Sequence, residues 1–208
     1  MADIFELFKK ISTDTSHGAE PITHIIVGLG NPGEEYTFTR HNAGFLTLDY
    51  ISQKCGCKIN RLKFKALCAD TQIEGKRVLL LKPQTFMNKS GEAVSEAAAF
   101  YKIPTENIIV ICDDVNFDAG AMRIRKKGSD AGQRGVRSII EHMNSDAFPR
   151  IKMGVGKKPS PDYDMADWVL SKFSKEEEIK LYAAIENAYD AVMLMLSGKT
   201  EQAMSKYN

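Results

Sequence analysis

The 208-residue sequence has no apolar run that approaches the roughly 20 residues of a membrane-spanning helix. Its first residues include Asp3 and Glu6, where a signal peptide would have an apolar centre. It also lacks an excess of charge of either sign, because its formal net charge is +1. We therefore expect a cytoplasmic protein without membrane contact, in which any nucleic acid binds to a local basic patch.

Cysteine is scarce as well. The sequence contains four cysteines, which are Cys55, Cys57, Cys68 and Cys112. No histidine accompanies the closest pair at zinc-finger spacing, so the pattern does not favour a metal site. We expect reduced thiols, as is usual for a cytosolic protein.

The chain divides into two parts. Residues 1–20 are interpreted as an N-terminal extension, in which four apolar residues share one helical face before a polar linker: Ile4, Leu7, Phe8 and Ile11. Residues 21–208 are long enough to form one domain with a substantial core, and 43% of the whole chain is hydrophobic. The sequence therefore predicts one folded domain after a short extension.

Strand and helix patterns alternate through this domain. Short apolar or alternating runs predict strands at Ile22–Val27, Ala66–Ile73, Arg77–Lys82, Ile108–Cys112, Ala121–Arg125 and Ile151–Val155. Helical spacing predicts helices at Asn42–Lys54, Glu92–Tyr101 and Val136–Met143, and from a capping box of Ser174 and Glu177 to about Leu196. The alternation favours an α/β domain with a mixed, largely parallel sheet flanked by helices, whose sites gather beyond the carboxyl ends of its strands.

The turn after the first strand contains Gly28-x-Gly30-x-x-Gly33, which fits the dinucleotide-binding fingerprint. Two details argue against a nicotinamide enzyme. Pro32 lacks the N–H group that such a loop offers to a pyrophosphate. The nearest suitable acid, Asp49, falls inside a predicted helix instead of ending a second strand. We therefore interpret the turn as a rigid chain reversal.

His41 is the histidine best placed for chemistry, because its ordinary pKa of about 6.5 suits a proton acceptor at neutral pH. Its position at a predicted helix start, taken alone, fits helix capping slightly better. Asp113 ends a buried strand and can meet His41 at the sheet edge, where it would fix the tautomer and stabilise the imidazolium. A turn-forming role is also consistent with Asp113.

The loop from Thr85 to Gly91 supplies two further candidates. Asn88 can donate to a developing oxyanion, and Phe86 offers a face for stacking a base. A helix-entry loop with a core aromatic residue would have the same pattern. No serine, threonine or cysteine has an evident activating partner, and the carboxylate next to Cys112 disfavours its thiolate. Water is therefore the expected nucleophile.

Basic residues cluster around glycine-rich turns in the second half of the chain. They are Arg123, Arg125, Lys126, Lys127, Arg134, Arg137, Arg150, Lys152, Lys157 and Lys158. A nucleic-acid contact and a merely solvated face are equally consistent with this run.

Several separated motifs together resemble the bacterial-type peptidyl-tRNA hydrolases, from about Ile22 to the C-terminal helix. The matching stretches are Ile26–Gly33, Tyr36, Thr39–Gly44, Lys82–Gly91, Cys112–Asp114, Gly120, Arg123, Arg125, Gly128, Gly132 and Gly135. The resemblance implies a single α/β domain, usually monomeric, around a twisted mixed sheet. It also implies hydrolysis of the ester bond between peptide and tRNA, with no metal or organic cofactor.

The resemblance assigns roles to matching residues. His41 matches the catalytic base, Asp113 the acid that supports it, and Asn31 an asparagine that helps to distinguish blocked from free aminoacyl-tRNA. The residues that match the lining of the site for the tRNA end and the peptide are Tyr36, Phe86 and Asn88. Two basic residues, Arg125 and Lys152, match those that hold a tRNA phosphate, and we expect Arg123 to extend this basic face.

One motif departs from the family pattern. Gln133-Arg134-Gly135 stands where the family commonly has His-Asn-Gly or Gln-Asn-Gly. Arg134 is longer and charged, so it can reach a phosphate or the peptide carbonyl instead. This departure also supports an alternative, a non-catalytic RNA-binding relative, against which the retention of His41, Asp113, Asn31 and Asn88 argues.

Overall fold

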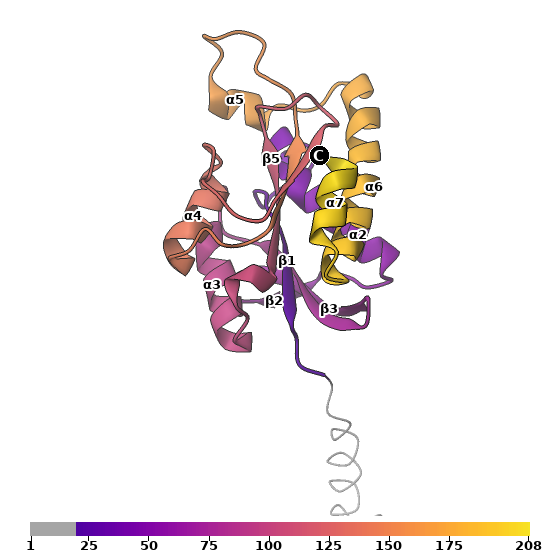
Figure 1. The fold of residues 1–208 in the computed structure, drawn as a ribbon. Helices are drawn as coiled ribbons and strands as arrows, with labels where there is room; N and C mark the ends of the chain where they lie inside the picture. The colour runs from indigo at the N-terminus through magenta and orange to yellow at the C-terminus, as the bar shows by residue number, and fades with distance from the viewer. Residues whose placement is uncertain (1–19) are drawn as a thin grey trace, which may run out of the picture.

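The computed structural model describes residues 20–208, so the helix expected in the N-terminal extension lies outside the described residues. One seven-stranded sheet runs through the domain in the order β2-β3-β4-β1-β5-β7-β6 (Figure 1). Its central strands are β4 (Lys76–Pro83), β1 (His24–Gly28), β5 (Ile108–Asp114) and β7 (Arg150–Gly154). These four are mutually parallel, whereas β2, β3 and β6 pair antiparallel at the edges. The expected mixed sheet is confirmed.

Burial explains which strands occupy the centre. All seven residues of β5 are buried, and β1 is buried at four of its five positions. Continuous apolar runs of this kind suit strands covered by helices on both faces. The edge strands are β2 (Arg61–Lys63), which has no buried residue, and β6 (Met122–Arg125). The remaining strand, β3 (Ala66–Ile73), lies between β2 and β4.

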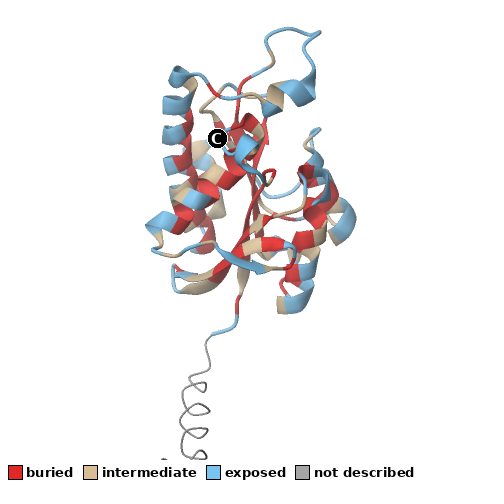
Figure 2. Ribbon diagram, turned by 180° about the vertical axis from the view of Figure 1, so that it is seen from behind, coloured by how far each residue is buried: buried red, intermediate tan, exposed pale blue. Residues whose placement is uncertain are grey.

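Helices cover both faces of the sheet (Figures 1 and 2). One face packs against α2 (Ala43–Lys54), α6 (Lys175–Leu196) and α7 (Thr200–Tyr207). The other packs against α3 (Ser90–Tyr101) and α4 (Arg134–Met143). Each layer forms its own apolar core with the alternate side chains of the strands, so the sheet lies between two cores.

Most predicted elements are present with small changes in their bounds. The predicted capping box is confirmed, since the Ser174 hydroxyl accepts from the Glu177 N–H and the Glu177 carboxylate accepts from the Ser174 N–H. The sequence missed the three-residue β2, the short helix α5 (Met165–Leu170), and α7. Within residues 20–208, no helix combines the length and apolarity needed to cross a membrane.

Three 3-10 turns lie in the loops that follow β1 and β4: η1 (Glu34–Tyr36), η2 (Arg40–Asn42) and η3 (Met87–Lys89). A fourth, η4 (Thr105–Asn107), precedes β5 at the other end of the sheet. The turn η2 leads directly into α2, and η3 leads into α3. The loops after β1, β4 and β5 thus converge at the carboxyl ends of the central strands, as expected for parallel strands.

Candidate active site

A cavity of about 480 Å³ opens at the carboxyl ends of the central strands. Its wall combines residues from the loops after β1, β4 and β5 with the start of α4 and one side of α5. Among its lining residues are Asn31, His41, Phe86, Asn88, Asp113, Arg134, Lys152, Met165 and Leu170. The cavity therefore lies at the strand ends where the sequence analysis expected a site.

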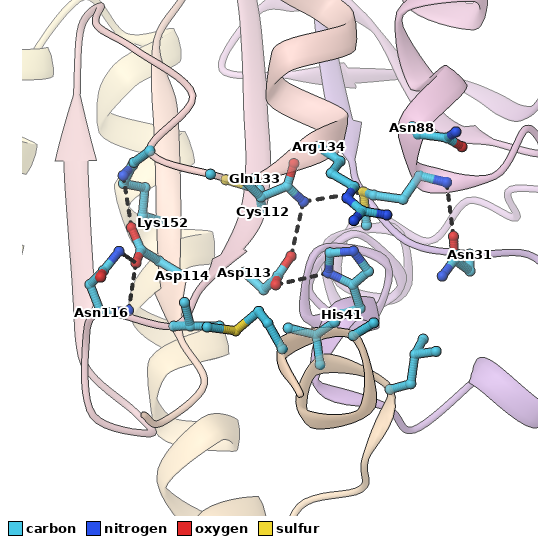
Figure 3. A pocket seen from close by; sticks show the side chains of 18 of the residues that line it. Asn31, His41, Asn88, Cys112, Asp113, Asp114, Asn116, Gln133, Arg134 and Lys152 are labelled. Atoms are coloured by element: carbon cyan, nitrogen blue, oxygen red, sulfur yellow. Dashed lines mark hydrogen bonds and ion pairs between the residues drawn. The ribbon is translucent and has the colours of Figure 1, made fainter. Parts of the chain in front are cut away.

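His41 and Asp113 meet in this cavity. His41 Nδ1 lies 2.9 Å from Asp113 Oδ2, and the side chains are only 11% and 3% exposed. The contact links η2 to the last residues of β5, 72 positions away. With Nδ1 donating to the carboxylate, Nε2 is the ring nitrogen left to act on a substrate (Figure 3). The predicted meeting of the two side chains is confirmed.

The environment of His41 sets its proton affinity. Burial lowers the pKa of His41, but the charge and the hydrogen bond of Asp113 raise it, and the net pKa lies above the ordinary 6.5. The nearby guanidinium of Arg134 acts in the opposite direction and lowers this pKa. The imidazole is thus more basic than a free histidine, as suits a group that accepts a proton from water.

Gln133 completes the contacts of Asp113, and the sequence had not identified it as a site residue. Gln133 Nε2 donates to Asp113 Oδ1 at 3.0 Å, while Gln133 Oε1 accepts from the Val136 N–H at 2.7 Å. One amide therefore caps α4 and orients the carboxylate (Figure 3). Its only signal in the sequence was its place three residues before the predicted helix Val136–Met143, which in the structure already begins at Arg134.

Asn31 is fixed by a reciprocal contact with Asn42. The Asn31 N–H donates to Asn42 Oδ1 at 2.8 Å, and Asn42 Nδ2 donates to the Asn31 carbonyl at 3.0 Å. Asn31 Oδ1 accepts from the N–H of Met87 at 2.8 Å. Within residues 20–208 its amide nitrogen has no partner, so Asn31 offers a donor to the cavity (Figure 3).

The rim of the cavity carries exposed side chains. Phe86 is 58% exposed, so it is not the core aromatic residue that its loop also allowed. Asn88 and Arg134 are exposed and line the cavity, and Arg134 is the first residue of α4. Tyr36, by contrast, lies half-buried in η1 and is not part of the cavity wall.

Cys112 lies at the base of the cavity and is fully buried. Burial, helped by the adjacent Asp113, raises the pKa of its thiol to about 12. A thiol of this acidity stays protonated at neutral pH and is a poor nucleophile. The expectation that its thiolate is disfavoured is confirmed.

Basic side chains continue from the cavity onto the edge of the sheet. Lys152 lines the cavity, and Arg123 lies directly opposite it across the β6–β7 pair. Arg125, two residues further along β6, shares the same face because side chains alternate along a strand. We call Arg123, Arg125 and Lys152 the basic stripe.

Arg150 does not belong to this surface, contrary to its grouping in the sequence. It is 1% exposed, and its guanidinium donates to the backbone carbonyls of Gly128, Ser129 and Asp146. Its charge is used to satisfy buried loop carbonyls.

Comparisons with known proteins agree with this geometry. The family profile of peptidyl-tRNA hydrolase matches residues 25–208. The peptidyl-tRNA hydrolase of Caldicellulosiruptor bescii is 50% identical to this chain, and the match covers 89% of this chain and 96% of that protein. The peptidyl-tRNA hydrolase of Agathobacter rectalis is also 50% identical, and the match covers 89% of this chain and 100% of that protein. The crystal structure of peptidyl-tRNA hydrolase from Acinetobacter baumannii superposes with a TM-score of 0.85 at 35% identity, over 92% of this chain and 97% of that chain. The chain belongs to the peptidyl-tRNA hydrolase family.

Proposed function

We propose that this chain hydrolyses the ester bond of peptidyl-tRNA, with His41 as the general base and water as the nucleophile. The observation that carries the proposal is the 2.9 Å contact between His41 Nδ1 and the buried Asp113 carboxylate in an open cavity. A carboxylate on Nδ1 fixes the tautomer whose Nε2 accepts a proton, and it stabilises the imidazolium that results.

The reaction proceeds by attack of water on the ester carbonyl. His41 Nε2 takes the proton of the attacking water, and this help typically contributes about 10² to 10⁴ in rate. Asn88, on the rim, is the proposed donor to the oxyanion. Asn31 offers its free amide nitrogen to the first peptide group of the substrate, a group that an aminoacyl-tRNA with a free amino group lacks. No metal or organic cofactor takes part in this mechanism.

The acceptor end of the tRNA lies along the basic stripe in this proposal. Phosphate contacts give affinity without reading base sequence, so tRNAs of many sequences serve as substrates. Phe86 is 58% exposed on the rim and stacks against a terminal base, while Tyr36, half-buried in η1, is outside the cavity wall. Arg134, exposed beside His41, contacts a phosphate or the peptide carbonyl.

The proposal extends to the location, the oligomeric state and the domain boundary of the protein. We propose a cytoplasmic monomer, with residues 1–20 as an extension to a hydrolase domain of residues 21–208. The family match, which begins at residue 25, supports this boundary. Gel filtration of the full chain tests the oligomeric state.

An assay with N-acetyl-aminoacyl-tRNA tests the function. The wild type is expected to release tRNA, and His41→Ala is expected to lose at least about 10² of this rate. His24→Ala is the matched control, because His24 lies on β1 outside the cavity wall. Full turnover by His41→Ala would remove His41 from the mechanism. A wild type that binds tRNA without releasing it would favour the non-catalytic RNA-binding alternative.

A further inference from the structure

Arg40, the residue before His41, makes an unusual number of buried contacts. Its side chain is 5% exposed. Nη1 and Nη2 donate to the two carboxylate oxygens of Glu177 at 2.9 and 2.8 Å, and Nε donates to Ser171 Oγ at 3.0 Å. Nη1 also donates to the carbonyl of Val155. A single guanidinium thus joins η2, the end of β7, the residue after α5, and the start of α6.

The same guanidinium lies against aromatic rings. Its central carbon is 3.7 Å from the ring centroid of Trp168 and 4.9 Å from that of Phe173. The Trp168 indole N–H in turn donates to the carbonyl of Gly156 at 2.9 Å. An arginine that stacks and pairs in two directions cannot be replaced equivalently by lysine, which has no planar group.

These contacts act on one side of α5, whose other side faces the cavity. Arg40 contacts Trp168 and also Ser171, which lies just beyond the helix. The residues of this segment that line the cavity are Met165, Ala166, Val169 and Leu170. The helix has six residues, none of them buried, so no apolar core of its own holds it in place. Its position depends on the contacts of Trp168 and Ser171 with Arg40, which include a backbone bond from the Arg40 N–H to the Ser171 carbonyl. A backbone bridge between Thr39 and Lys172 also holds the residues just after the helix.

The imidazole of His41 has contacts of its own outside this cluster. It is fixed by Asp113, and Asp113 by Gln133 on the opposite side of the cavity. Loss of the Arg40 side chain therefore affects the wall formed by α5 more than the catalytic pair. The two parts of the site can be separated by experiment.

We propose that Arg40 is a positioning residue that holds α5 as the substrate-contacting wall of the cavity. The role assigned to the wall rests on the proposed function, whereas the anchoring of α5 does not. The apolar side chains of Met165, Val169 and Leu170 form a surface suited to apolar groups of the bound peptide. Arg40 acts on substrate binding through α5 and does not touch the reacting atoms.

The test compares Arg40→Lys with Arg77→Lys in the full chain. Arg77 also makes a two-pronged pair, with Asp70, but at the amino end of β4, away from the cavity. For Arg40→Lys we expect KM for N-acetyl-aminoacyl-tRNA to rise about three- to tenfold while kcat stays within about twofold, the pattern of lost binding interactions. Arg77→Lys is expected to leave both constants unchanged.

Trp168 is the one tryptophan of the sequence, so its fluorescence reports on α5 without any turnover. Arg40→Lys is expected to shift the emission to longer wavelength, because the indole loses its stacked partner, and Arg77→Lys is expected not to. Unchanged emission, or a fall in kcat with KM unaltered, would overturn the proposal. A wild type without hydrolase activity would instead refute the proposed function, and the emission would still test the anchor.

Ser171→Ala provides the test if Arg40→Lys does not fold. This variant removes only the hydroxyl that accepts from Arg40 Nε and donates to the Trp168 carbonyl. We expect the same changes with smaller amplitude, a rise in KM of about two- to threefold and a smaller emission shift. Constants and emission identical to the wild type in this folded variant would contradict the proposal.

Discussion

The ammonium group of Lys152 is paired with the carboxylate of Asp114, at 2.7 Å from Asp114 Oδ2, in the wall of the cavity. The side chains are 15% and 5% exposed, so the pair is largely shielded from water. Asp114 Oδ1 is also occupied, by the N–H and the amide of Asn116. A phosphate that binds to Lys152 must therefore compete with a well-held carboxylate.

Asp114→Asn is expected to tighten tRNA binding, because it removes this competitor and leaves Lys152 free. One additional phosphate contact steepens the dependence of log K on log salt by about 0.7 to 0.9. Binding titrations at several salt concentrations measure the slope. Asp70→Asn is the control, since it removes the same charge at the opposite end of the sheet. An unchanged slope would show that Asp114 does not compete with a phosphate for Lys152.

The pH profile is expected to report on the charges around His41. Because the net pKa of His41 is raised, a base at this position loses activity as pH falls through a value above 6.5. Arg134→Asn removes a cation that lowers this pKa, so the acidic limb of kcat/KM is expected to move to higher pH. Asp113→Asn removes the groups that raise the pKa and is expected to move the limb to lower pH, with a loss of about 10² in kcat/KM. If both variants keep the wild-type limb, the limb does not belong to His41.

The meeting of His41 and Asp113 could be predicted from the sequence, because both residues lie at or beyond the carboxyl ends of predicted strands. Asp113 ends a fully buried apolar run and His41 lies in the loop after another such strand, so parallel pairing of β1 and β5 brings the two together. The helix α5 could not be predicted in this way. It has six residues, none buried, and is positioned by a stacked arginine 128 residues earlier, a contact with no local sequence pattern.

Close packing at Gly44 also escaped sequence reasoning, although the residue lies in the resembling motif. A Cβ atom at Gly44 would lie 2.4 Å from the Ile111 carbonyl oxygen and 2.5 Å from the Leu29 nitrogen. The absence of a side chain lets the first turn of α2 approach β1 and β5 closely. This approach brings the preceding turn η2, which contains His41, up to the end of β5.

Gly44→Ala is therefore expected to destabilise the protein by about 1–3 kcal/mol, because backbone atoms cannot move aside as side chains do. In an unconstrained helix the same change would stabilise by up to about 1 kcal/mol, so the sign of the effect is diagnostic. Chemical denaturation gives the free energy of unfolding, with Glu96→Ala on α3 as the control. A variant as stable as the wild type would show that α2 shifts without cost.

Gln133→Ala is expected to lower both stability and activity, because two of the hydrogen bonds of this side chain have different consequences. Loss of the cap on the Val136 N–H costs about 0.5–2 kcal/mol in unfolding free energy. Loss of the donor to Asp113 Oδ1 frees the carboxylate to rotate, so kcat falls although His41 is intact. Gln133→Glu separates the effects, since its carboxylate still accepts from the Val136 N–H but repels Asp113. We expect Gln133→Glu to retain most of the unfolding free energy of the wild type and to lose at least as much kcat as Gln133→Ala. If Gln133→Glu has the same kcat as the wild type, Gln133 has no role in orienting Asp113.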